Sequence, residues 1–221
     1  MLTRPLASLL AAEVISTTGS QMTSLALPWF VLVSTGSAKQ MSFVLAGSIA
    51  GYALFGIPSG AVLAALGSRR TMLIADAACA PLTALIPILH WTGHLSLGLL
   101  VAIAFVLGVL ATPYLSAQRV IVPELLGEET EPVARANALF QGAARISMLG
   151  GPALAGLLIG LIGAPAVLLV DAATFVVAFL LVLAFVPARG EAPAAGEDQP
   201  SGILRGVCSR FRSRGGLRQS A

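Results

Sequence analysis

A glutamate inside the first long apolar segment is the residue best suited to do chemistry in this chain. Glu13 is followed by Thr17, Ser20, Gln21 and Ser24, whose spacing places all five on one helix face. A carboxylate inside a membrane helix costs ~2.5–3.5 kcal/mol on insertion scales unless protein or a wet cavity receives it. The stripe therefore predicts a polar cavity with Glu13 as a titratable group. In the structural alternative, Glu13 lies near the inner interface and extends its carboxylate toward water, or it accepts hydrogen bonds from neighbouring helices.

Three further ionisable residues fall inside apolar segments. Arg145 lies about three turns into its segment, so it calls for a buried acidic partner or an anionic substrate, and both remain open. Asp76 and Asp171 each follow a tight glycine turn, where a carboxylate can accept hydrogen bonds and meet the positive end of a helix. We predict a structural role for both aspartates, with Arg69, Arg70 or Arg145 as the candidate partner of Asp76.

The composition predicts an all-α integral membrane protein. Hydrophobic residues make up 57% of the chain and charged residues 10%, whereas soluble domains carry about a quarter charged residues. Apolar segments recur that are long enough to cross ~30 Å of hydrocarbon. We predict six transmembrane helices, over 6–33, 41–66, 71–91, 97–115, 134–161 and 165–185. The charged stretch 116–133 is predicted to be a loop.

Several functional classes are disfavoured. The chain has no HExxH, GxSxG or Walker motif, and no GxGxxG in a strand–helix setting, so we predict that it is not an enzyme. No basic face on a soluble fold is available to bind nucleic acid. His90 and His94 stand at a helix end, where an interfacial role is expected. We expect neither a cofactor nor a metal site.

Two stretches, 56–76 and 150–171, echo each other. Each holds two glycines seven residues apart and then an aspartate followed by two alanines; the matching residues are Pro58, Gly60, Gly67 and Asp76, and Pro152, Gly156, Gly163 and Asp171. Arg69 and Arg70 follow the first turn, whereas the second turn is uncharged, so the two turns should lie on opposite sides of a membrane. The pattern predicts two inverted three-helix repeats and favours a secondary transporter over an enzyme.

Small residues form a stripe in the fifth predicted helix, at Ala143, Ser147, Gly151 and Ala155. We expect Gly151 and Pro152 to allow close helix packing. The alternative is a functional bend that closes a cavity on one side.

The distribution of Lys and Arg predicts the orientation in the cell membrane. Arg4, the Arg69–Arg70 pair, Arg119, Arg135 and the arginines of the tail fall on one side, and only Lys39 falls on the other. Residues 1–187 are therefore predicted to be a multi-pass transmembrane domain with both termini in the cytoplasm. Residues 188–221 change to a Pro-, Ala- and Gly-rich composition followed by arginines, which predicts a flexible basic tail near anionic lipid.

Four stretches together resemble the N-terminal half of a major facilitator superfamily transporter, in the drug-efflux branch that includes macrolide exporters. They are GSQMTSLALPWFVLVSTGSA, the turn at Gly60–Arg70, TPYLSAQRVIVPELLGEETEPVARANALFQ and SMLGGPALAG. The first carries ALPW and TGS, the second resembles the superfamily's signature loop, and the last is similar to its antiporter motif. The signature loop normally carries an acid and a base where this chain has Ala64 and Ala65.

The resemblance implies a proton-coupled exporter of small amphipathic, drug-like molecules. Glu13 would serve proton coupling, with Thr17, Gln21 and Arg145 lining the cavity. Such transporters place the substrate site near the midplane between two six-helix halves. The chain stops in what resembles the linker before a seventh helix, so we expect a second half-transporter or another copy as partner. The alternative is a non-transporting membrane protein that acts by association with another transporter chain.

Overall fold

The computed structural model describes residues 4–126 and 130–187, and this part of the chain is helical apart from short turns. Its helices are α1 (Arg4–Thr35), α2 (Ala38–Phe55), α3 (Ser59–Leu66), α4 (Ser68–Trp91), α5 (Leu97–Leu126), α6 (Thr130–Ile162) and α7 (Ala164–Phe185). The described ranges contain no strand, which confirms the all-α prediction. The predicted tail, 188–221, lies outside them, so the division into two domains stays a prediction.

The second predicted helix is broken. Instead of one helix over 41–66, α2 ends at Phe55 and α3 begins at Ser59, and the two are bent by 61°. Pro58 stands at the break, where it lacks the amide proton that would continue the helix and restricts the residue before it. The prediction of one continuous helix was therefore wrong at Gly56–Pro58.

The predicted loop over 116–133 was also wrong, because α5 continues to Leu126. Ala117 and Ile121, four residues apart, are buried in an apolar cluster, while Arg119 points outward and is exposed. Ser68 at the start of α4 donates a hydrogen bond to Glu124 near the end of α5. An amphipathic helix with one packed face explains the charges that suggested a loop.

Four described helices are long and apolar enough to cross a membrane: α4, α5, Glu131–Ile162 of α6, and α7. The bent pair α2 and α3 makes a fifth candidate when counted as one broken span. By length α1 qualifies as well, since 32 residues rise ~48 Å. Its apolarity falls short because of the polar stripe that contains Glu13 and Gln21. The predicted count of six spans therefore stays a prediction, with α1 as the sixth candidate by its length.

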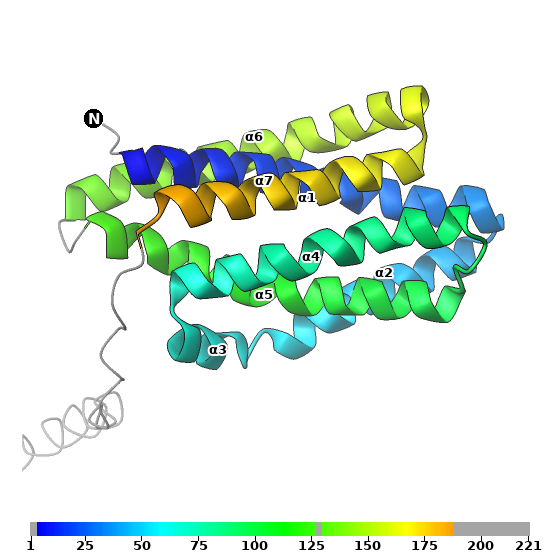
Figure 1. Cartoon of the computed structure of the whole chain (residues 1–221), viewed down its shortest axis with the longest axis horizontal. Helices are drawn as coiled ribbons and strands as arrows, with labels where there is room; N and C mark the ends of the chain where they lie inside the picture. Colours follow the sequence, from blue (N-terminus) through cyan, green and yellow to red (C-terminus); the bar gives the residue numbers. More distant parts are fainter. Residues whose placement is uncertain (1–3, 127–129, 188–221) are drawn as a thin grey trace, which may run out of the picture. The chain divides into compact units, whose positions relative to one another are not determined.

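The two repeats run in opposite directions through the bundle (Figure 1). The α3–α4 turn lies at the same end as the start of α1 and the end of α7, while the α6–α7 turn lies at the other end. Arg69 at the start of α4 bonds the carbonyl of Val186 just past α7, whereas Gly163 stands directly before α7, whose 22 residues rise ~33 Å. We call the first end the arginine end; Arg4, Arg69, Arg70, Arg119 and Arg135 lie toward it.

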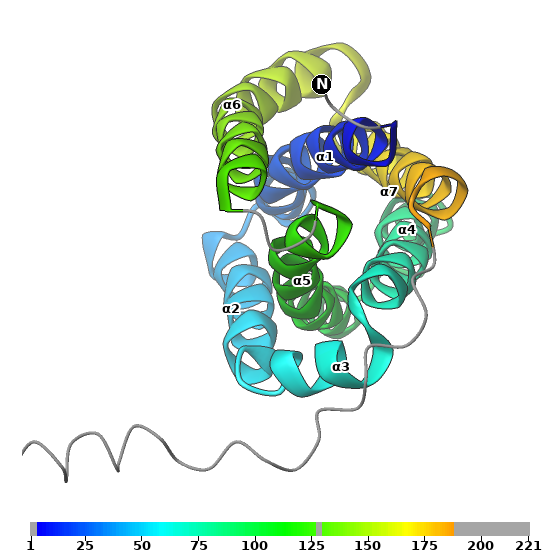
Figure 2. The same ribbon diagram turned by 90° about the vertical axis from the view of Figure 1, so that its left-hand side faces the viewer.

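Packing within the bundle repeats in the same way (Figure 2). If α1, α2–α3 and α4 are matched to α5, α6 and α7, the contact of α1 with α7 corresponds to that of α5 with α4. Likewise the contact of α1 with α6 corresponds to that of α5 with α2. The turn glycines also match, with φ/ψ of 76°/159° at Gly67 and 83°/155° at Gly163. These dihedrals favour glycine, and the match supports the inverted-repeat prediction.

Glycines allow the closest helix contacts. A Cβ on Gly51 of α2 would fall on the carbonyl oxygen of Phe105 in α5, and one on Gly108 of α5 would fall on that of Ser48. In the corresponding contact of α1 with α6, a Cβ on Gly151 would lie 2.5 Å from the Cβ of Gln21. Helices therefore meet backbone to backbone at these positions, as small residues permit.

Candidate functional site

A buried polar layer crosses the bundle between two apolar clusters. The cluster toward the arginine end includes residues 6–12 of α1, residues 178–182 of α7 and Val186 just past α7, and the other cluster includes residues 22–31 and 164–168 of the same helices. The polar side chains buried between these clusters are Glu13, Ser16, Asp76, Thr83, Thr112, Ser147 and Asp171. Since apolar side chains pack on both sides, the layer lies far from either end of the bundle, and we take it as the candidate site.

Glu13 lies in this layer with only 2% of its surface exposed. Thr17 Oγ1 donates a hydrogen bond to its Oε1 at 2.6 Å, and Tyr114 of α5 donates to its Oε2 at 3.4 Å. Gln118, one turn after Tyr114, also reaches the carboxyl group. Within the described ranges no Lys or Arg pairs with it. The carboxyl is thus held inside the bundle by polar neutral groups on two helices.

The polar stripe of α1 does not have one environment. Glu13 is buried, Thr17 and Gln21 are partly buried, and Ser20 and Ser24 are exposed. The structure therefore joins Glu13 with Thr17, while the two serines face outward from this half of the fold.

Asp76 of α4 is as buried as any charged residue described, with 1% exposed. Neither of its carboxyl oxygens has a hydrogen-bond partner among the described residues. It lies close enough to Glu13 for their charges to interact. The predicted pairing with Arg69, Arg70 or Arg145 is absent from the described part of the chain.

Asp171 of α7 occupies the matching place in the second repeat, but its surroundings differ. Thr23 of α1 donates a hydrogen bond to its Oδ2 at 2.5 Å, and Thr174 donates to its Oδ1 at 3.1 Å. Gly19 leaves the space for this contact, because a Cβ there would fall on Asp171 and Thr174. Asp171 thus joins α7 to α1, and the structural role predicted for it stays a prediction.

Residues of the signature turn lie at the arginine end, away from the polar layer. Arg69 donates from Nε to the carbonyl oxygen of Val186 at 2.7 Å and from Nη2 to that of Leu183 at 3.0 Å. Leu183 lies in the last turn of α7 and Val186 is its C-cap residue, so the cation also meets the negative end of the helix. Arg70 is exposed, and nothing lies within 4 Å of a Cβ placed on Gly60.

The residues of α6 lie along its contact with α1 or face outward. Thr18 donates to Ser147 Oγ at 2.9 Å, next to the contact of Gly151 with Gln21. Pro152 interrupts neither α6 nor this contact, and Gly156 has open space around it. Arg145 is exposed about halfway along α6, and no ion pair with it occurs in the described ranges. The structure does not bring it to Glu13.

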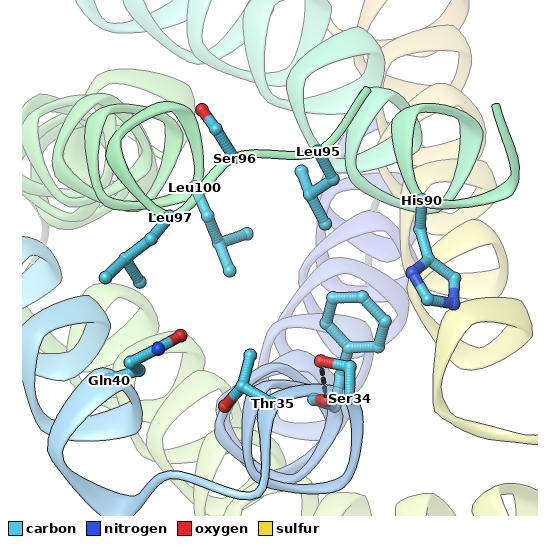
Figure 3. Close-up of a pocket in the computed structure, with 9 residues that line it drawn as sticks. Ser34, Thr35, Gln40, His90, Leu95, Ser96, Leu97 and Leu100 are labelled. Atoms are coloured by element: carbon cyan, nitrogen blue, oxygen red, sulfur yellow. Dashed lines mark hydrogen bonds between the residues drawn. The ribbon is translucent and has the colours of Figure 1, made fainter. Parts of the chain in front are cut away.

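A pocket of about 230 Å³ lies at the opposite end from the arginine end, between α1, α2, α4 and α5 (Figure 3). Its lining includes Ser34, Gln40 and His90, and the His90 ring stands edge-on to Phe30 with centroids 4.9 Å apart. The pocket excludes Glu13 and the other residues predicted to contact a substrate. No three His, Cys, Asp or Glu residues of the described part gather as metal ligands would.

Sequence reasoning missed Tyr114 and Gln118 as partners of Glu13. They stand four residues apart, which is one turn of a helix. That signal was hidden because the stretch from 116 onward was expected to be a loop.

Comparison with known proteins gives consistent matches. The model of the Major Facilitator Superfamily matches residues 9–216. The chain is 25% identical over 208 residues to "Multidrug efflux pump Tap" of Mycobacterium tuberculosis (strain ATCC 25618 / H37Rv), covering 92% of this chain and 49% of that protein. It is 28% identical over 182 residues to the protein of the same name from Mycolicibacterium fortuitum, covering 80% of this chain and 44% of the relative. The chain thus spans about half the length of these relatives. No solved structure matches.

Proposed function

Since the chain belongs to the Major Facilitator Superfamily, we propose that it forms one six-helix half of a secondary transporter that exports small amphipathic, drug-like molecules across the cell membrane. Two findings support this proposal. The relatives that match over about half their length carry the name of a multidrug efflux pump. The bundle is all-helical with its repeats inverted, as expected for half of a major facilitator fold. Membership of a family of membrane transporters also agrees with the absence of enzyme motifs from the sequence.

Proton coupling is assigned to Glu13. The observation that carries this assignment is a carboxyl group buried in the middle of the bundle, held by Thr17 and Tyr114, with no cation beside it in the described residues. Its charged form is costly in such surroundings and its protonated form is not. Proton uptake and release therefore change the free energy of the bundle by several kcal/mol, enough to bias one conformation over another.

The substrate cavity is proposed to lie along the faces of α1 and α6 that point away from this bundle, against a second half or another copy. Ser20 and Ser24 of α1 and Arg145 of α6 are exposed although they lie well inside their helices. Polar and charged groups at membrane depth face protein or a wet cavity. Thr17 and Gln21, partly buried beside them, complete the proposed lining.

The orientation in the membrane follows from the positive charges. Because Lys and Arg are enriched in cytoplasmic loops, the arginine end is proposed to face the cytoplasm.

A second candidate function is association with another transporter chain without transport. It is favoured by Ala64 and Ala65, both exposed on α3, where the family's signature loop carries an acid and a base. Without these charges, α3 has no ionisable residue with which to hold a second half closed.

Flux measurements distinguish the two functions. The purified chain is reconstituted in vesicles, alone and together with a co-expressed six-helix C-terminal half, and movement of a fluorescent amphipathic cation is followed under a pH gradient. We expect gradient-dependent flux that is lost in Glu13→Gln and kept in Ser42→Ala, a substitution at an exposed serine of α2. Unchanged flux in Glu13→Gln would remove that residue from coupling. No flux in either preparation would favour association.

A further inference from the structure

Asp76 and Asp171 form a natural comparison within one chain. Both are 1% exposed, both follow a positive-φ glycine, and they correspond in the two repeats. Asp171 accepts hydrogen bonds from Thr23 and Thr174, whereas Asp76 accepts none from a described residue. A structural role explains the first aspartate. The same role fails for the second, because a buried polar group left without a partner destabilises a fold.

Among residues 4–126 and 130–187, the groups that face Asp76 include no cation. Glu13 of α1, Tyr114 of α5 and Cys79 of its own helix lie within electrostatic reach of it. From α7 the ionisable residue of the layer is Asp171, which also acts on Cys79. The arginines of α4 stand at its start, where Arg69 bonds the end of α7 and Arg70 is exposed, and α3 has no ionisable residue.

Two buried carboxyl groups within electrostatic reach of each other repel when both are charged, and no cation among the described residues offsets that cost for either. Such a pair binds and releases protons as a unit, and its titration belongs to the pair. The state with at least one proton is therefore strongly favoured. A protonated Asp76 also gains a donor of its own.

We infer that Asp76 is a second proton-binding residue, and that it forms with Glu13 a buried carboxyl pair that carries at most one negative charge. The inference rests on the proposed function only for its use: a pair that keeps one proton can exchange the other with the medium during transport. Tyr114, which donates to Glu13, is a positioning residue of the pair.

Infrared spectroscopy tests the inference without requiring transport. The carbonyl-stretch band of protonated carboxyl groups is recorded as a function of pH for the reconstituted wild-type chain and for Asp76→Asn, Glu13→Gln and Asp171→Asn. We expect Asp76→Asn to remove part of the band. We expect Glu13→Gln to change the ratio of protonated to charged Asp76 by about tenfold at a given pH, as for two groups whose titrations are coupled by about one pK unit. Asp171→Asn should leave the coupling between the other two unchanged.

Two results would overturn the inference. In one, Asp76→Asn leaves the band unaltered at every pH, so that Asp76 is charged throughout. In the other, the losses in Asp76→Asn and Glu13→Gln simply add, so that the groups titrate independently. If Asp76→Asn does not fold, as judged by circular dichroism, Asp76→Glu keeps the acid and should retain a coupled band. Coupled bands in a chain without flux would support the carboxyl pair and refute the proposed function. Flux that is lost in Glu13→Gln, together with uncoupled bands, would support the proposed function and refute the pair.

Discussion

The contact between α1 and α6 allows a quantitative test with two neighbouring glycines. A Cβ on Gly151 would lie 2.5 Å from Gln21 Cβ and 3.2 Å from the carbonyl oxygen of Thr18, while nothing lies within 4 Å of a Cβ on Gly150. Gly151→Ala therefore requires α1 and α6 to separate by about 1 Å to restore an ordinary contact. That movement would stretch the 2.9 Å hydrogen bond from Thr18 to Ser147 beyond useful length.

The two substitutions are expected to change the free energy of unfolding in opposite directions. For Gly151→Ala, overpacking costs about 1–3 kcal/mol and the lost hydrogen bond about 0.5–1.5 kcal/mol. Replacing glycine inside a helix offsets up to about 1 kcal/mol of this. We expect a net loss of about 0.5–3.5 kcal/mol for Gly151→Ala, and a gain of about 0.5–1 kcal/mol for Gly150→Ala.

Unfolding in mixed micelles, followed by circular dichroism as sodium dodecyl sulfate replaces a mild detergent, measures both variants under the same conditions. The two substitutions add the same methyl group at adjacent positions, so effects on insertion and helix propensity cancel. Equal stabilities, within about 0.5 kcal/mol, would refute the close contact and with it the placement of Gln21 against α6.

The remaining predictions concern the helix ends and the polar layer. Thr23→Val removes the hydrogen bond to Asp171 and should cost about 1.5–3 kcal/mol in the same unfolding assay if that carboxyl is charged, and less if it is neutral; no loss at all would contradict the bond. Arg69→Ala should speed amide hydrogen exchange in the last turn of α7, where Arg69 bonds two carbonyls, while Arg70→Ala should not. Tyr114→Phe should retain flux but alter its dependence on pH, since Glu13 loses one donor; an unchanged profile would remove the tyrosine from the site.

Much of the fold follows from local sequence. Hydropathy and the turn glycines predicted the helical segments, because the cost of exposing backbone and polar groups to lipid acts on each segment by itself. The internal repeat was visible because it too depends on local conformation: Gly67 and Gly163 adopt dihedrals that other residues rarely adopt. The stripe on α1 pointed to Glu13 because a carboxylate is expensive at that depth wherever the helix packs.

Tertiary structure decided what the polar residues meet. Local sequence could not separate Asp76 from Asp171, which share the same motif, because their difference lies in what α1 brings to them: Thr23 bonds Asp171, whereas Glu13 lies near Asp76. The length of α5 was likewise hidden, since Arg119 and Glu124 look like loop charges until Ala117 and Ile121 pack against other helices. The sequence by itself determined which groups are costly in a membrane. Only the packing of helices decided which of them share a compartment, since electrostatic repulsion and hydrogen bonding depend on distances between segments far apart in the chain.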